Sequence, residues 1–427
     1  MRPGLGTPRI QMGAFLIGNG VSLIGNTLTL VGLPWFVLQT TGSAGKTGLT
    51  GMAFALPAFL AGLFGGILID RLGGRRMSAI ADVVSGTSVA LIPLLHLTVG
   101  LSFWQLLILV FFGAMLDIPG LTARRTMLPQ LSERAGIRPE AMNSAFETTD
   151  AFAIIVGPAI AGLLIAWIGA VNLLLFDAAT FAISALLIGL VVPDTIAATA
   201  RDDDMVEGVG SAWSEILAGL HFIRADRLLL ALALILVFTN FFNGPFFTVI
   251  MPVIVNDRYG AASEYGLLLT AFGIGSLMGG AAYGAFGHRL RAHRLELWLV
   301  GFASVAVIRW LLVPDYPYVL LLATMALAGL LSGPVNPLLV TVRFERIPVH
   351  LRGRVFATFA ALASIADPLG MATVGYAIEQ VGLHETLVVT AVLFTALVLI
   401  VPFIRVIRQM NLPAAEGDPE TVTPPRE

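Results

Sequence analysis

Long apolar stretches alternate with short polar segments along almost the whole chain. A helix needs about 20 mostly apolar residues to cross the hydrocarbon core of a bilayer, and twelve stretches approach or exceed that length. We predict spanning helices over 11–39, 47–69, 77–98, 102–123, 143–168, 170–192, 228–256, 264–287, 295–313, 317–341, 354–380 and 384–404. The sequence therefore predicts an all-α membrane protein with both ends on the same side.

The composition agrees with this pattern and narrows the chemistry. Only 12% of the 427 residues are charged, whereas 57% are hydrophobic, and soluble domains carry about 25% charged residues. The net charge of -2 provides no basic field for nucleic acid. Because cysteine is absent, disulfides, thiol catalysis and cysteine-bound metal centres are excluded, and we expect no bound metal.

Basic residues concentrate in alternate loops. One set of loops carries almost all the arginines, whereas the other set carries only Lys46 and Arg258. Loops rich in Arg and Lys stay in the cytoplasm. We therefore expect both termini in the cytoplasm and a multi-pass protein of the bacterial cytoplasmic membrane, its first helix acting as an uncleaved signal anchor.

The two halves of the chain share a pattern of glycines. Gly42 and Gly48 follow Pro34 with the same spacings as Gly260 and Gly266 follow Pro252. Gly162 and Gly169 likewise match Gly375 and Gly382. Such a repeat predicts two pseudo-symmetric six-helix halves with a cavity between them, and alternating access by rocking of the halves.

The repeat defines the domain boundaries. We predict an N-terminal bundle over 1–192 and a C-terminal bundle over 228–408. The linker, 193–227, contains an acidic stretch at 201–204 and then apolar residues at helical spacing, which predict an amphipathic helix. The Pro- and Glu-rich tail, 409–427, is predicted to be disordered.

The loop between the second and third spans carries the most specific motif. It combines helix-ending glycines, one aspartate at the membrane face and a cluster of arginines: Gly66, Asp70, Arg71, Gly73, Arg75 and Arg76. The pattern resembles the loop 2–3 signature of the major facilitator superfamily, and the resemblance extends over the whole chain. It implies the twelve-helix fold, and it implies that Asp70 helps to lock the outward-facing state by contacting helix eleven.

A second motif lies in span five. Gly157, Pro158 and Gly162 resemble the antiporter signature of the superfamily, with small residues replacing three of its glycines. Small residues allow close helix packing and proline bends the helix. The usual arginine motif of span four is missing. Together these features are similar to the macrolide-efflux and siderophore-exporter branch of drug:proton antiporters, also called transmembrane secretion effectors.

Carboxylates inside predicted spans are candidates for proton coupling, because each costs about 2.5–3.5 kcal/mol at a span centre. Asp150 is the first candidate, followed by Asp367, Asp117 and Glu147. Glu147 has an alternative role as the ion-pair partner of Arg124 or Arg125, which we expect at the cytoplasmic gate. Asp177 also qualifies as a functional candidate by its position in a span, but we favour a structural role for it, as a helix cap or as one partner of a pair.

Aromatic and amide side chains in span seven predict a cavity for an amphiphile. The candidate lining residues are Asn26, Phe112, Phe238, Asn240, Phe241, Asn243 and Asn336. Arg309 stands alone among apolar residues of span nine. It either extends to the outer interface, toward Asp315, or binds an anionic part of the substrate.

Three classes of function compete. The first is proton-coupled efflux of amphiphilic drugs or secondary metabolites, with protons, membrane lipids and a small amphiphilic substrate as partners. The second is uptake by a symporter, or transport of a lipid or lysophospholipid, on the same fold. The third, a membrane enzyme or scaffold, lacks any supporting motif. No phosphate-binding loop is present, so we expect the proton-motive force to supply the energy without a cofactor, and we expect a monomer.

Overall fold

The computed structural model describes residues 5–193 and 209–411, and all regular structure in these ranges is helical. The acidic stretch at 201–204 and the tail from 412 onward lie outside them. The α-helices are α1 (Pro8–Thr41), α2 (Ala44–Leu72), α3 (Gly74–Thr98), α4 (Phe103–Ala114), α5 (Asp117–Ala135), α6 (Pro139–Leu186), α7 (Val209–Ala225), α8 (Arg227–Pro245), α9 (Met251–Arg258), α10 (Ala262–Phe286), α11 (Arg294–Leu311), α12 (Tyr318–Ser332), α13 (Val335–Arg346), α14 (Arg352–Val381) and α15 (Leu383–Ile400). Short 3₁₀ or π segments are η1 (Leu187–Val191), η2 (Phe246–Ile250), η3 (Gly287–His293), η4 (Val349–Leu351), η5 (Val401–Phe403) and η6 (Ile407–Asn411).

The helices account for twelve membrane spans. In the described part of the chain, nine helical stretches are long and apolar enough to cross a membrane. Two of them, Pro139–Val191 with 53 residues and Ala262–Leu311 with 50, are each long enough for two spans and contain a break. The remaining span is α2, with 29 residues. The predicted fold class is thus confirmed.

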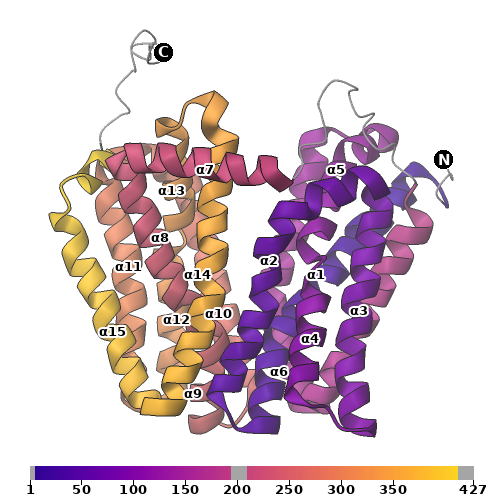
Figure 1. The fold of residues 1–427 in the computed structure, drawn as a ribbon, viewed down its shortest axis with the longest axis horizontal. Coiled ribbons are helices and arrows are strands. Elements are labelled where there is room, and N and C mark those ends of the chain that lie inside the picture. Colours follow the sequence, from indigo (N-terminus) through magenta and orange to yellow (C-terminus); the bar gives the residue numbers. More distant parts are fainter. Residues whose placement is uncertain (1–4, 194–208, 412–427) are drawn as a thin grey trace.

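Two helical bundles stand side by side (Figure 1). One contains α1 to α6 and the other α8 to α15. Helices α5, α7 and α13 lie at the same end of the molecule (Figure 1). We call this end the arginine-rich face, because the last turns of α5 and α13 carry Arg134, Arg343 and Arg346, and we call the other end the opposite face.

Positive backbone angles break two long helical stretches at matching places. Gly169 has φ 82° and ψ 160°, and it separates the fifth span from the sixth within α6. Gly382 has φ 103° and ψ 160°, and it separates α14 from α15. Side chains rarely tolerate a positive φ, whereas glycine does. The repeat seen in the sequence therefore places the same turn in each half.

The halves contact each other through four glycines, which we call the interface glycines: Gly48, Gly162, Gly266 and Gly375. A Cβ atom on Gly48 of α2 would lie 2.2 Å from the carbonyl oxygen of Met371 in α14. A Cβ atom on Gly266 of α10 would lie 2.2 Å from the carbonyl oxygen of Pro158 in α6. The two contacts correspond under the repeat, and each glycine lies within about two turns of a helix end at the opposite face.

The linker contains the helix that the sequence predicts. Helix α7 covers Val209–Ala225 and packs on α14 of the C-terminal half. The Thr358 hydroxyl donates to the Ile216 carbonyl at 3.1 Å. Gly219 lies so close that a Cβ atom there would be 2.1 Å from the Thr358 hydroxyl oxygen. The described part of the linker thus belongs structurally to the second half.

Candidate functional site

A buried ion pair lies inside the N-terminal half. Nη2 of Arg124, on α5, lies 2.7 and 2.8 Å from the two carboxylate oxygens of Asp82, on α3. Their side chains are 4% and 3% exposed. A buried pair is stable only when the remaining donors and lone pairs are also satisfied.

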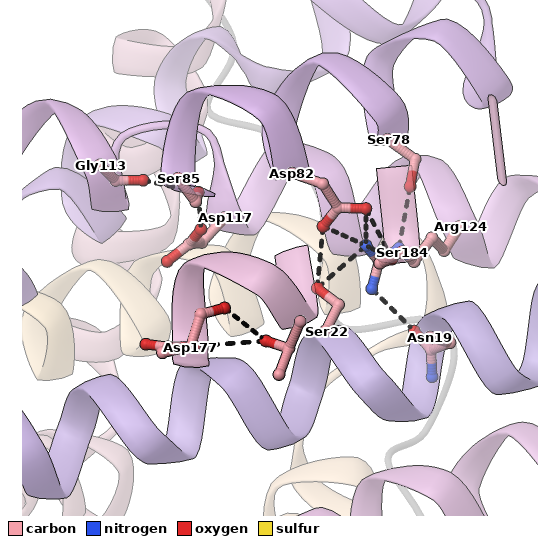
Figure 2. Close-up of polar contacts among 11 residues, drawn as sticks. Asn19, Ser22, Ser78, Asp82, Ser85, Gly113, Asp117, Arg124, Asp177 and Ser184 are labelled. Carbon is pink, nitrogen blue, oxygen red and sulfur yellow. Dashed lines mark hydrogen bonds and ion pairs between the residues drawn. The ribbon is translucent and has the colours of Figure 1, made fainter. Parts of the chain in front are cut away.

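Neutral polar groups from α1, α3 and α6 complete the surroundings of this pair (Figure 2). Nε of Arg124 donates to Ser78 at 2.8 Å, and Nη1 donates to the Asn19 oxygen at 3.2 Å. The hydroxyls of Ser22 and Ser184 donate to Asp82 at 2.8 and 2.7 Å. The pair therefore ties four helices of one half together.

One sequence expectation is corrected here, and one residue that the sequence analysis missed is added. Arg124 does not lie at an exposed gate, because it is buried and the partners described above all belong to its own half. Asp82 was missed as an intramembrane carboxylate. It lies nine residues into α3, and the rule that selected the other carboxylates would have selected it too.

Arg125, the next residue, contacts two of the candidate carboxylates. Its Nη2 lies 3.3 Å from Glu147 and 3.6 Å from Asp150. The expected ion pair of Glu147 is thus confirmed with Arg125. Arg125 and Glu147 are 52% and 60% exposed, whereas Asp150 is 19% exposed, so the cluster leads from the surface into the bundle.

A cavity of about 350 Å³ brings three predicted residues together. Asn26 of α1, Asp117 of α5 and Asp150 of α6 line it, with mostly apolar neighbours such as Phe54 and Ile154. Oδ1 of Asp150 is buried without a hydrogen-bond partner. The cavity therefore presents two carboxyl groups and one amide within an apolar wall.

The contacts of Asp117 suit a carboxyl group that carries a proton. The Ser85 hydroxyl lies 2.8 Å from the Gly113 carbonyl and also 2.8 Å from Oδ1 of Asp117. A hydroxyl has one proton to donate. If Ser85 donates to the carbonyl, its oxygen can accept a hydrogen bond from a protonated Asp117 (Figure 2). A neutral Asp117 satisfies both contacts at once.

Asp367 occupies a comparable place in the C-terminal half. It precedes Pro368 in α14 and faces Gly244 of α8, where a Cβ atom would lie 2.6 Å from its Oδ1. That oxygen is buried and has no hydrogen-bond partner. The position fits a further carboxyl group inside the membrane, separate from the cavity that Asp117 and Asp150 line.

The C-terminal half has its own cavity, of about 230 Å³. Its polar lining includes three amides that the sequence predicted, Asn240, Asn243 and Asn336. Aromatic rings of Phe246, Phe247, Phe272, Trp298 and Phe302 form much of the remaining wall. Aromatic walls with a few amides suit a flat amphiphile.

Three predicted aromatic residues lie elsewhere. Phe112 is 54% exposed, contacts the ring of Phe111 and lines none of the cavities described here. Phe238 packs between Phe242 and Phe394. Phe241 packs on Phe242 as well and is absent from the cavity lining. The sequence identified the aromatic helix, but it did not identify which of its faces points inward.

Arg309 is fully buried and does not reach the outer interface, which corrects one of its two expected roles. Its Nη2 donates to the Asn243 side chain at 2.9 Å, and its guanidinium lies 3.7 Å from the ring centre of Phe394 and 4.5 Å from that of Phe246. Asp315 instead pairs with Arg258, at 3.1 Å. Arg309 lies behind the cavity wall and fixes Asn243, which lines it.

The structure describes part of the motif in the loop between the second and third spans. Gly73 has φ 77° and joins α2 to α3. Arg75 donates to the Val192 carbonyl at 3.3 Å, while Arg71 and Arg76 are exposed. The surroundings of Gly66 and the Asp70 side chain lie outside the described residues, so the expected contact of Asp70 with helix eleven stays a prediction.

The span-five motif connects three helices. A Cβ atom on Gly157 would lie 2.6 Å from the Thr27 side chain of α1. The next residue, Pro158, and Gly162, just over one turn later, face Gly266 of α10. The motif therefore packs α6 on α1 of its own half through Gly157, and on α10 of the other half through Pro158 and Gly162.

The fold and these cavities define a membrane transporter built from two related six-helix halves. The model of the Major Facilitator Superfamily matches residues 15–366 and, in a second alignment, 233–427. The chain belongs to this superfamily, and it is a transporter rather than an enzyme.

Characterised relatives cover nearly the whole chain. It is 34% identical over 383 residues to the multidrug efflux pump Tap of Mycolicibacterium fortuitum, covering 89% of this chain and 92% of that protein. It is 22% identical to macrolide efflux protein A of Streptococcus pyogenes, covering 88% and 92%. The crystal structure of the nucleoside transporter NupG has the same fold, with a TM-score of 0.74 at 14% identity, covering 93% and 98%.

Proposed function

We propose that this protein exports small amphiphilic compounds, drugs among them, across a bacterial cytoplasmic membrane in exchange for protons. The observation that carries the proposal is the cavity shared by Asn26, Asp117 and Asp150. It offers an apolar wall for the substrate and carboxyl groups for the proton in one place. The similarity over almost the full length to a multidrug efflux pump supports the export direction and the breadth of substrates.

The arginine-rich face is the cytoplasmic side in this proposal, because loops rich in arginine remain in the cytoplasm. The interface glycines then lie near the external ends of their helices, where the halves are in contact. The Arg125 cluster, which leads to Asp150, lies toward the cytoplasm. With the halves in contact at the external end, this conformation receives substrate from the cytoplasmic side. We also propose that the protein acts as a monomer.

Substrate and proton compete for the same carboxyl groups. A cationic amphiphile that enters the cavity is stabilised by ionised Asp117 or Asp150, so its binding releases a proton to the cytoplasm. After the halves rock, protons from outside neutralise the carboxyl groups and the substrate leaves. Exchange of one proton for one monovalent cation moves no net charge, so the pH gradient drives it, and one pH unit supplies about 1.4 kcal/mol, enough for a substrate gradient of about tenfold.

The proposal is tested in everted vesicles with ethidium, a fluorescent cationic amphiphile. We expect the wild-type protein to accumulate ethidium when respiration acidifies the vesicles, and ethidium to dissipate the pH gradient in return. The D117N and D150N variants should each lose accumulation at least ten-fold. The matched control is D257N, which removes an exposed carboxylate at the end of α9 and should transport normally.

Two outcomes would contradict the proposal. Ethidium movement in the reverse direction would indicate uptake. Accumulation that survives a protonophore would separate transport from the proton gradient. In both cases a folded, membrane-inserted protein is first verified by its elution as a single peak in detergent.

A further inference from the structure

One buried carboxyl has no part in the mechanism so far. Asp177 of α6 is 0% exposed, and the Thr29 hydroxyl of α1 contacts its Oδ2. The Thr180 hydroxyl lies 3.3 Å from Oδ1 and donates to the Asp177 carbonyl at 2.7 Å. Only neutral hydroxyls contact this carboxyl group within the described residues, so its ionised form lacks a paired cation.

A small cavity lies between Thr29 and Asp117. It has about 20 Å³, and its lining includes Asn26, Thr29, Ser85 and Asp117. A water molecule needs roughly 10–15 Å³ of such space and two to four polar partners, and this cavity has room for one. Asn26 and Asp117 line the larger cavity as well, so the two cavities meet at these residues.

The three carboxyl groups stand at successive depths. Asp150 lies eleven residues after the start of α6 at the arginine-rich face, which is about 16 Å at 1.5 Å per residue. Asp177 lies eight residues after the break at Gly169, about 12 Å from the opposite face. Asp117, which lines both cavities, connects the two sites.

The charged groups near Asp177 leave it free to gain and lose a proton. Helix α1 carries Arg9 as its one titratable residue, twenty positions before Thr29. Helix α3 contributes Asp82, whose charge is already paired with Arg124 of α5. Within the described residues the remaining carboxyl neighbour is Asp117, which lines the same small cavity as Thr29, and two neighbouring carboxyl groups disfavour holding two negative charges.

We propose that Asp177 is a second proton-binding site of the transporter, linked to Asp117 by one water and the Thr29 hydroxyl. A proton leaves the Asp117 carboxyl for the water, the water passes one to the Thr29 oxygen, and the Thr29 hydroxyl gives its own to Oδ2 of Asp177. One proton moves in total, and the water and the hydroxyl are restored. The reverse sequence delivers an external proton to Asp117. This inference rests on the proton-coupled export proposed above.

The test uses the full-length protein in liposomes, with ethidium as substrate and a pH dye inside. We expect D177N to reduce ethidium-driven proton flux at least ten-fold, whereas ethidium exchange at equal pH, which needs no net proton movement, persists. Thr29→Val keeps the carboxyl and the side-chain shape but removes the relay hydroxyl, and it should also slow the proton flux. Thr29→Ser should restore it, and D257N serves as the unaffected control.

The results separate this inference from the proposal on which it rests. Absence of ethidium-driven proton flux in the wild type overturns both. Normal proton flux in D177N overturns the role of Asp177 alone. If D177N fails to insert or loses exchange, Thr29→Val decides: unchanged proton flux in that variant makes Asp177 a structural residue and overturns the relay.

Discussion

Arg124 and Asp82 form their ion pair inside the N-terminal half, at 2.7 Å, rather than across the interface between the halves. The partners of the pair come from α1, α3, α5 and α6. A contact that connects four helices of one bundle is preserved when the two bundles rock as rigid bodies. Its role is therefore to keep the N-terminal half rigid during transport.

Breaking this pair is expected to destabilise the protein strongly. Arg124→Gln leaves the Asp82 charge buried without a partner, a change that costs about 3–5 kcal/mol. The double variant Arg124→Gln, Asp82→Asn removes both charges and should recover a large part of that loss. Thermal unfolding in detergent measures both. Equal melting temperatures for the wild type and Arg124→Gln would contradict the structural role.

The interface glycines are expected to control closure of the opposite face. In Gly266→Ala the new methyl group would overlap the Pro158 carbonyl oxygen, at 2.2 Å, so the two helices must separate. The chain has no cysteine, and a single Asn26→Cys reporter therefore gives a clean signal. Labelling of intact cells with a membrane-impermeant maleimide should rise several-fold in Gly266→Ala.

A matched glycine provides the control for this measurement. A Cβ atom on Gly284, also in α10, would have no neighbour within 4 Å. Gly284→Ala should therefore label like the parent protein. Equal labelling of the Gly266 and Gly284 variants would show that the α6–α10 contact does not hold the opposite face closed.

A hydrogen bond at the opposite face adds to the contact between α2 and α14. The Ser43 hydroxyl accepts from the Lys46 amide as the N-cap of α2, and it donates to Glu379 of α14 at 3.0 Å. Ser43→Ala removes both contacts, whereas Ser43→Gly removes the same hydroxyl but costs the helix cap only a few tenths of a kcal/mol.

The two Ser43 variants therefore separate the cap from the link between halves. Both should raise labelling of the Asn26→Cys reporter, because both lose the bond to Glu379. Only Ser43→Ala should also lose about 1 kcal/mol of stability through the cap. A rise in labelling confined to Ser43→Ala would assign the effect to helix stability instead.

Span number and repeat were predictable because both depend on local sequence. An apolar run of sufficient length specifies a span wherever it packs, and Gly169 and Gly382 require the same turn in each half. The placement of Arg124 was not predictable in this way. Helix α5 continues without a break past the predicted end of span four, so a residue expected in a loop lies inside the bundle.

Side-chain direction is the second limit on prediction from sequence. Phe112 and Asn26 were predicted for one cavity, but Phe112 points outward and Asn26 lines the cavity with Asp117. Helical spacing alone cannot distinguish the two directions in a bundle where both sides of a span are apolar. Asp82 was detectable from its position in a span, and its partner was not, because α3 and α5 meet only in the tertiary structure.

Arg309 and Asn243 provide the last prediction. The planar guanidinium of Arg309 lies over the rings of Phe246 and Phe394 and donates to Asn243 at 2.9 Å and to the Phe242 carbonyl at 3.2 Å. A lysine ammonium cannot reproduce this combination of stacking and directed hydrogen bonds. We expect Arg309→Lys to lower the stability by about 2–4 kcal/mol and to weaken ethidium binding, because Asn243 loses its fixed orientation in the cavity wall. Arg405→Lys, at an exposed position, should leave both unchanged. Thermal unfolding and ethidium fluorescence titration measure the two effects, and unaltered binding in a destabilised Arg309→Lys would show that Asn243 does not contact the substrate.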